Sequence, residues 1–388
     1  IEIMENSPDS RSSVYRCFAS FSRIAAQAVS EDIEPFANAM IEDLSNCSQD
    51  PYLVFAIAES VSEIIEFIPA SFYSHASNFF EAFLQLFDYF SKSSFQTIDE
   101  DENNNIDDDE IDSFIEEIDQ TQSTCGEILN CLSVIFSAYP NDLASQFGLI
   151  YEAIIELLKS GKNILVIGAS NSVIVISPFL AEEEEFNPNS IVKLIVKNIE
   201  QIEIENENDL LAVRLLFNAL YAICSDSGKD IFDDEENDEK ALECLGVFFA
   251  ECLSMKIHSI TDESESNILN DLQGCVMNAL AAFIMGGAFR LCENQSEIVA
   301  ILLEHQEANK KRQFQSFAIA ALARICFVNQ QITGEMAVIL MNSIITIFAK
   351  QKKRISDGCK NSYFFSMIFI LASHPEIVDE EMLGRIRD

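Results

Sequence analysis

The feature that most constrains this chain is an internal repeat of apolar segments, each built around a central isoleucine. Most of the segments end in a turn or helix-breaking residue, as in SEIIEFIP and SVIFSAYP, and consecutive isoleucines lie 41, 70, 39, 49, 61, 41 and 45 residues apart. The repeat isoleucines are Ile24, Ile65, Ile135, Ile174, Ile223, Ile284, Ile325 and Ile370. A unit of this size cannot bury its apolar face alone, so the repeats must stack on one another.

Four of these intervals lie close to the ~40–47 residues typical of HEAT or armadillo units. The three long intervals each contain an acidic segment, and a stack of repeats tolerates such insertions in its loops. We therefore predict an all-α fold, an α-α superhelix of the HEAT/armadillo solenoid type made of stacked antiparallel helix pairs. Residues 1–98 and 114–388 would form one continuous solenoid, with 99–113 as a disordered acidic loop. Since the sequence begins at Ile1, we expect it to be a piece of a longer chain.

Apolar residues at steps of three and four predict the individual helices. Ser12–Val29, Ile33–Cys47 and Val54–Ile68 show this pattern, and Phe72–Phe90 shows it most clearly. One stripe of the last segment contains Phe72, Ala76, Phe79, Phe80, Phe83, Phe87 and Phe90. The segment Ile164–Ser177 is β-branched and contains a glycine, like a strand and turn of a nucleotide-binding sheet. Because it also falls on the repeat register, we interpret it as a helix.

The charge of the chain indicates which partners it can attract. With 24 basic and 64 acidic residues the net charge is −40, yet 48% of the residues are hydrophobic, so we expect a folded body with a strongly negative surface. Such a field attracts basic proteins or cations and repels nucleic acid and anionic membrane, neither of which we expect as a direct partner. The longest apolar run, Phe364–Ala372, is half of the ~18 residues needed to cross a membrane. None of the 11 cysteines forms a C-x-x-C pair, which favours reduced cysteines in a cytosolic or nuclear protein.

The acidic run from Asp99 to Asp119 contains no basic residue. Like charges at this density repel one another, so we favour a solvated loop at its centre. One alternative is a calcium loop, because oxygen-bearing side chains occupy positions 1, 3, 5, 7, 9 and 12 of that motif: Asp99, Asp101, Asn103, Asn105, Asp107 and Glu110. Position 6 is Asn104 where the motif has glycine, and a run this rich in Asp and Asn matches the motif often.

The sequence contains no pattern of an enzyme. The histidines His75, His258, His305 and His374 have no nearby serine, cysteine or carboxylate in a nucleophile arrangement. Neither a phosphate-binding glycine loop nor an H-E-x-x-H motif occurs. We therefore expect a binding protein without catalysis, cofactor or metal.

Several segments, in order, resemble the importin-β superfamily of karyopherins, and most closely the C-terminal half of the karyopherin beta three type. The first is TCGEILNCLSVIFSAYPNDLASQFGLIYEAIIELLK, which follows the acidic insertion. The next, LQGCVMNALAAFIMGG, is similar to a small-residue helix of the family that closes on two glycines. QFQSFAIAALARICFVN and ILASHPEIV are similar to its final repeats, although Gln315–Ser316 stand where the family usually has asparagine.

This resemblance implies a nuclear import receptor that shuttles between cytoplasm and nucleus through the nuclear pore. Such receptors bind basic cargo with nuclear localisation signals, phenylalanine-rich nucleoporins and Ran-GTP, whose site would lie mostly outside this chain. We expect acidic second-helix and loop residues to meet cargo, with these candidates: Asp107, Asp108, Asp109, Glu110, Asp112, Asp233, Asp234, Glu235 and Glu236. The alternative is a HEAT-repeat scaffold or regulatory subunit of a phosphatase or ubiquitin-ligase assembly, because the same fold serves both.

Overall fold

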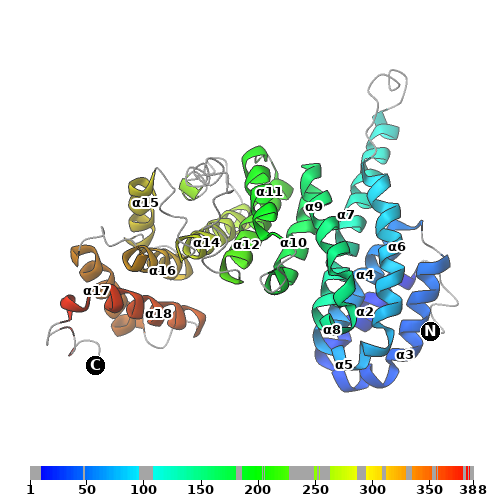
Figure 1. Cartoon of the computed structure of the whole chain (residues 1–388), viewed down its shortest axis with the longest axis horizontal. Coiled ribbons are helices and arrows are strands. Elements are labelled where there is room, and N and C mark those ends of the chain that lie inside the picture. Colours follow the sequence, from blue (N-terminus) through cyan, green and yellow to red (C-terminus); the bar gives the residue numbers. More distant parts are fainter. Residues whose placement is uncertain are drawn as a thin grey trace. The chain divides into compact units, whose positions relative to one another are not determined.

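The computed structural model describes residues 10–46, 49–95, 108–180, 186–202, 204, 206–226, 249–250, 253, 263–285, 294–307, 312–328, 334–351, 355, 357–378, 382 and 384. For residues 108–114, 207, 263–271, 306–307, 312–314, 350–351 and 357–358 it describes the backbone alone. The described residues form helices and turns and contain no strand (Figure 1). The chain divides into two compact units, which meet in sequence around residues 180–187.

Nearly all of the described residues of the first unit are helical. Its helices are α2 (Arg11–Ile24), α3 (Ala26–Asn46), α4 (Pro51–Phe67), α5 (Pro69–Phe72), α6 (Ala76–Ser94), α7 (Asp108–Ala138), α8 (Pro140–Leu143), α9 (Phe147–Ser160) and α10 (Asn163–Leu180), with single 3-10 turns at Tyr73–His75 and Ala144–Gln146. The second unit contains α11 (Pro188–Gln201), α12 (Glu207–Asp226), α14 (Glu263–Met285), α15 (Gln295–Glu307), α16 (Arg312–Val328), α17 (Gly334–Gln351) and α18 (Asp357–Ser373), with a 3-10 turn at Pro375–Ile377.

Within each unit the helices pack in two layers, as the repeat predicts. The repeat isoleucines lie on α2, α4, α7 and α10 of the first unit and on α12, α14, α16 and α18 of the second, and we call these helices the isoleucine layer. Successive members contact one another, as α2 and α4, α4 and α7, and α14 and α16 do. The intervening helices, such as α3, α6, α11, α15 and α17, pack against them. Each unit is therefore a HEAT-type stack of helix pairs, and the predicted all-α fold class is confirmed.

Six of the eight repeat isoleucines are buried, which shows that the register marks the core. The two others differ: Ile24, at the end of α2, is 81% exposed, and Ile174 on α10 is partly exposed. The phenylalanine stripe from Phe72 to Phe90 is buried at every position that the sequence indicated. The segment Ile164–Ser177 is helical, within α10, so its interpretation as a helix is confirmed.

The same backbone corner ends four helices of the isoleucine layer. The corner residues Ala25, Ile68, Tyr139 and His374 have φ between −136° and −133° and ψ between 49° and 63°. Each donates its backbone N–H to the carbonyl oxygen four residues earlier, over 2.7–3.1 Å. In three of the four corners the next residue is proline, which disfavours the helical conformation for the residue before it. The corner therefore fixes where these helices stop.

Two boundaries differ from the sequence prediction. Ser12–Val29 is not one helix, because the chain turns at Ala25 and α3 already begins at Ala26. Only this corner lacks a proline, so the sequence carried no local signal for it. In addition, α7 begins at Asp108, so residues 108–113 are helical where we expected the end of the acidic loop. Acidic residues are favoured in the first turn of a helix, because its N-terminus carries partial positive charge. Residues 99–107 lie outside the described part, and the division into 1–98, 99–113 and 114–388 stays a prediction.

One helix of the described part is long and apolar enough to cross a membrane by length and composition alone. It is α10, with a mean hydropathy of 1.7 over 18 residues, so the prediction that Phe364–Ala372 is the longest apolar segment is wrong. More than half of α10 is buried within the chain, as in the core helix of a HEAT stack. Its apolar composition is therefore explained by packing.

Candidate functional site

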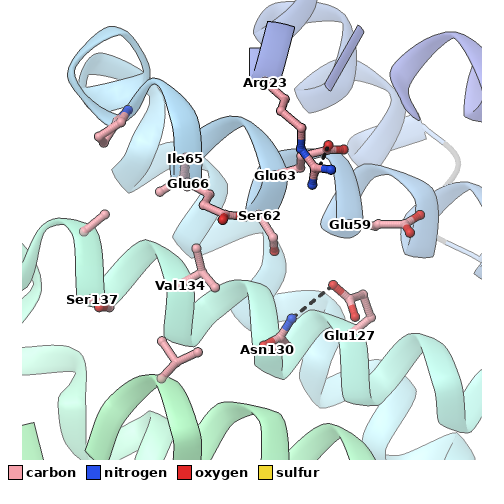
Figure 2. Close-up of a pocket in the computed structure, with 13 residues that line it drawn as sticks. Arg23, Glu59, Ser62, Glu63, Ile65, Glu66, Glu127, Asn130, Val134 and Ser137 are labelled. Atoms are coloured by element: carbon pink, nitrogen blue, oxygen red, sulfur yellow. Dashed lines mark hydrogen bonds and ion pairs between the residues drawn. The ribbon is translucent and has the colours of Figure 1, made fainter. Parts of the chain in front are cut away.

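The first unit has a groove on the surface of its isoleucine layer. It has a volume of about 760 Å³ and runs across α2, α4 and α7, with one contact from α10 (Figure 2). Its lining consists of Arg23, Glu59, Ser62, Glu63, Ile65, Glu66, Pro69, Glu127, Asn130, Val134, Ser137, Ala138 and Val175. Four of these side chains are carboxylates and one is basic, so the groove is acidic.

Three of the carboxylates come from one face of α4. Glu59, Glu63 and Glu66 are spaced by four and three residues, which places their side chains on the same side of a helix. The neighbouring residues Ile64 and Val61 are buried in the core, so the glutamate face is turned to solvent. Because the helix holds the three groups at fixed intervals, they form a ladder of negative charge along the groove.

The fourth carboxylate, Glu127, comes from α7 and lies partly buried opposite α4. Asn130, one turn further along α7, donates its side-chain amide to Glu127 Oε1 over 3.3 Å. Burial raises the pKa of Glu127 to about 7, the Asn130 hydrogen bond opposes that shift, and the negative charge of Glu59 adds to it. Within the described part of the chain no basic side chain pairs with Glu127. Near neutral pH Glu127 is therefore only partly ionised, and a cation from outside would stabilise its ionised form.

The raised pKa of Glu127 predicts a pH-dependent effect on stability. A carboxyl whose pKa is higher in the folded chain lowers stability as pH rises from its ordinary pKa of 4.5 through the folded value of about 7. Glutamine has no such charge. We therefore expect Glu127→Gln to stabilise the first unit by about 2 kcal/mol more at pH 8 than at pH 5, since one pKa unit corresponds to about 1.4 kcal/mol. Urea unfolding of wild type and variant at both pH values measures this, and an equal difference at the two would contradict it.

Two arginines of α2 show how the α4 ladder receives a guanidinium group. Arg16 Nε donates to Glu59 Oε2 over 2.6 Å, and its guanidinium carbon lies 5.7 Å from the centre of the Phe55 ring. Arg23 Nη2 lies 3.9 Å from Glu63 Oε1, with the guanidinium carbon 5.2 Å from the Phe67 ring centre. Each arginine thus meets a carboxylate and an aromatic face together, and both contacts favour a cation. Arg16 and Arg23 are well exposed, so these pairs stabilise the fold only weakly.

The acidic residues that the sequence suggested as cargo contacts are not the ones that line this groove. Asp107, Asp233, Asp234, Glu235 and Glu236 lie outside the described residues. The side chains of four others are also outside the description, although their backbone belongs to α7: Asp108, Asp109, Glu110 and Asp112. All nine therefore stay predictions. The calcium loop likewise falls outside the described part.

Sequence reasoning missed the four glutamates of the groove because it followed the density of acidic residues. The signal that could have found three of them is the spacing Glu59, Glu63 and Glu66 around the repeat isoleucine Ile65. The fourth, Glu127, lies more than sixty residues later in sequence and joins them only through the packing of α4 against α7. This is a non-local arrangement that a pattern within one helix does not reveal.

Among the described residues, no group of three or more His, Cys, Asp and Glu side chains is placed to hold a metal ion. The described cysteines are not paired in disulfides, and four of them are buried: Cys125, Cys131, Cys224 and Cys326. Burial raises the pKa of these thiols, for example to about 12 at Cys224 and about 11 at Cys326. They are therefore protonated core residues at neutral pH, as the sequence suggested, and poor nucleophiles.

No protein-family model matches the sequence, and no curated protein matches it. Solved structures do match the fold. The crystal structure of Kap121p, a karyopherin, is similar over 96% of this chain and 37% of its own, with a TM-score of 0.52 and 14% sequence identity. The fold is that of a karyopherin.

Two further structures with this fold are similar over most of the chain. They are a crystal structure of importin beta (TM-score 0.49, 11% identity, covering 87% of this chain and 45% of that one) and Kap121p bound to Ste12p (TM-score 0.42, 13% identity, covering 99% and 45%). The chain thus spans less than half the length of the karyopherin structures that it matches. At 14% identity, the similarity to the Kap121p structure shows a shared fold.

Proposed function

We propose that this chain is part of a nuclear transport receptor and that it binds basic segments of cargo proteins in the groove of the first unit. The observation that carries this proposal is the convergence of Glu59, Glu63, Glu66 and Glu127 around a groove with a single arginine. The karyopherin fold supports the class of protein, because structures of Kap121p have been solved bound to Pho4p and to Ste12p. The protein would be a binding protein without catalysis.

The mechanism is electrostatic attraction followed by specific pairing. A net charge of −40 raises the local concentration of basic segments and speeds their encounter with the chain. In the groove, Lys or Arg side chains of the cargo then meet Glu66 and Glu127, which have no basic partner among the described residues. We expect an incoming arginine to adopt the geometry of Arg16, which contacts Glu59 and Phe55.

The wider role of a transport receptor is part of the same proposal. It includes shuttling between cytoplasm and nucleus, contact with phenylalanine-rich nucleoporins, and a response to Ran-GTP whose site lies mostly outside this chain. The acidic segments around Asp107–Asp112 and Asp233–Glu236 would extend the negative surface that basic cargo approaches. Each of these rests on the karyopherin fold together with the charge of the chain.

The test is the binding of a fluorescent peptide of alternating Lys and Arg, measured by polarisation over a series of salt concentrations. We expect affinity that falls as salt rises, because the attraction is between charges. The triple variant Glu59→Gln, Glu63→Gln and Glu66→Gln should bind about tenfold more weakly, since one decade corresponds to about 1.4 kcal/mol. The paired variant Glu81→Gln and Asp88→Asn, which removes exposed carboxylates of α6, is the control and should bind nearly as well as wild type.

Two outcomes would contradict the proposal. One is the absence of any binding of the basic peptide, which is the behaviour expected of a scaffold or regulatory subunit of another assembly. The other is an equal loss of affinity per charge removed in the α4 variant and in the α6 control, which would mean that only the total charge matters. A loss confined to the α4 variant supports the groove as the site.

A further inference from the structure

The isoleucine layer of the second unit differs in charge from the acidic layer of the first. Its last three helices contribute the stretches Leu272–Met285 of α14, Gln315–Val328 of α16 and residues 359–373 of α18. In a chain with 64 acidic residues, these stretches contain no Asp or Glu. Their charged residues are Arg324 and Lys360, both basic. This surface therefore lacks the feature that attracts basic segments to the groove.

Arg324 lies on α16, partly buried and without a counter-ion among the described residues. Its Nη1 donates to the backbone oxygen of Ala320 over 3.0 Å, within its own helix, and its guanidinium carbon lies 5.3 Å from the centre of the Phe369 ring on α18. In the part of the chain that the structure describes, no carboxylate pairs with it. Burial lowers the pKa of Arg324, and Tyr221 on α12 is its electrostatic neighbour. A partly buried cation that has lost water and has no anion beside it would be stabilised by an anion from a partner.

Exposed aromatic side chains surround this arginine. Phe327, one turn along α16, is 42% exposed and its ring centre lies 5.2 Å from that of Phe369. Tyr221 is 44% exposed. Tyrosine and arginine are among the residues that dominate the binding energy of protein interfaces, where flanking apolar contacts exclude water. An aromatic cluster around a cation that lacks its anion thus has the composition of an interface.

We propose that Tyr221, Arg324, Phe327 and Phe369 form a docking surface for a protein segment in which a carboxylate lies beside an apolar side chain. The carboxylate would pair with Arg324, and the apolar side chain would pack on the rings of Phe327 and Phe369. Planar guanidinium and carboxylate groups match in geometry and can form two parallel hydrogen bonds. A basic segment is excluded here, because the cation would repel it. A phosphate-rich polyanion is disfavoured by the net charge of −40, whereas a single carboxylate between apolar groups meets less repulsion.

This surface has a salt dependence that distinguishes it from the groove. An acidic segment approaches a chain of the same sign, so added salt screens repulsion rather than attraction. We therefore expect its affinity to stay level or rise with salt, while the affinity of the basic peptide for the groove falls. The two activities can thus fail independently, since they involve different units, ligands of opposite charge and opposite responses to salt.

The experiment uses the full chain and a short fluorescein-labelled peptide that alternates Glu with Phe and Leu, with a peptide in which Gln replaces Glu as the neutral control. We expect wild type to prefer the acidic peptide, and Arg324→Gln to weaken its binding about tenfold or more, as for the loss of a charge-assisted pair. Arg324→Lys should recover part of the loss, because it restores the charge but not the planar fork. Lys92→Gln on α6, which removes an exposed charge, should bind like wild type.

Tyr221→Ala and Phe327→Ala test the aromatic part of the surface at exposed positions, where the fold tolerates truncation, and each should weaken the acidic peptide several-fold. Circular dichroism of every variant checks that the helices are retained. The proposal is overturned if wild type does not bind the acidic peptide, if it binds the neutral peptide equally well, or if folded Arg324→Gln binds the acidic peptide like wild type. Binding of a single-stranded oligonucleotide that depends on Arg324, without binding of the peptide, would also overturn it.

Discussion

Replacing Gly168 by alanine is expected to destabilise the first unit by about 2–3 kcal/mol, the effect of forcing extra volume into a close contact. Gly168 on α10 faces Gly126 on α7, and the two backbones touch. A methyl group on Gly168 would overlap the Cα of Gly126 and lie 2.9 Å from both its carbonyl carbon and its carbonyl oxygen. Backbone atoms of a packed helix cannot rotate aside, so the two helices would have to separate. Alanine usually stabilises a helix relative to glycine, so the sign of the effect is diagnostic.

Two other glycines provide the controls for Gly168→Ala. A methyl group on Gly126 would lie 3.1 Å from the Cα of Gly168, so Gly126→Ala should be destabilising by a smaller amount. A methyl group on Gly148 would meet only the Phe186 ring, at 3.4 Å, and Gly148→Ala should be neutral or slightly stabilising. Hydrogen exchange of the α7 and α10 amides, together with urea unfolding, measures all three variants. A Gly168→Ala variant as stable as Gly148→Ala would show that α7 and α10 do not approach this closely.

The same contact explains why the segment around Gly168 resembled a strand and turn. Its glycine suggested a nucleotide-binding loop, and its many β-branched residues suggested a sheet. In the structure the glycine allows close helix packing, and the apolar side chains Leu165, Val166, Val173 and Ile176 are fully buried. Local propensity was therefore overridden by tertiary packing. The spacing of 39 residues between Ile135 and Ile174 predicted the helix, because it places Ile174 at the same position of its repeat as the other repeat isoleucines.

Much of the fold could be predicted because it depends on period and repetition. The register placed every repeat isoleucine in the isoleucine layer of its own unit, and the phenylalanine stripe was predicted residue by residue, because both follow from burial on one face of a helix. The corner at Ala25 could not be predicted from the sequence, because no proline follows it. The exposure of Ile24 could not be predicted either. It arises because α2 is the first described helix of its layer and Ile24 is the last residue of α2.

The candidate site was less predictable, and the reason is physical. Acidic runs are visible in sequence because like charges cluster there, but repulsion within a run also favours solvation over a defined site. A groove requires carboxylates from different helices, here Glu63 on α4 and Glu127 on α7, held together by core packing. The surface around Arg324 is marked in the sequence by a lack of negative charge and not by a cluster of charges. Its signal in the sequence is the absence of acidic residues from the stretches Leu272–Met285, Gln315–Val328 and 359–373, which becomes informative only against the charge of the whole chain.

Reversing two charges of the groove is expected to abolish most of its affinity for basic segments. In the double variant Glu63→Lys and Glu66→Lys, two carboxylates of the α4 ladder become ammonium groups at partly and fully exposed positions, so the fold should tolerate the change. Each reversal removes an attraction and adds a repulsion, and like charges placed together at an interface are strongly unfavourable. We expect the polarisation-measured affinity for the Lys/Arg peptide to fall about 100-fold or more at low salt, equivalent to about 2.8 kcal/mol.

The matched control reverses the same number of charges on the other layer, through Glu81→Lys and Asp88→Lys on α6. Both double variants change the net charge of the chain by the same amount, so any long-range effect on encounter is equal in the two. A loss of affinity that is at least tenfold larger in the α4 variant would therefore place the binding energy in the groove rather than in the overall field. Equal losses would show that the chain attracts basic segments without a defined site. Because the α4 variant leaves Arg324 and its aromatic neighbours unchanged, its binding of the acidic peptide should be retained or slightly improved, since its net charge is less negative.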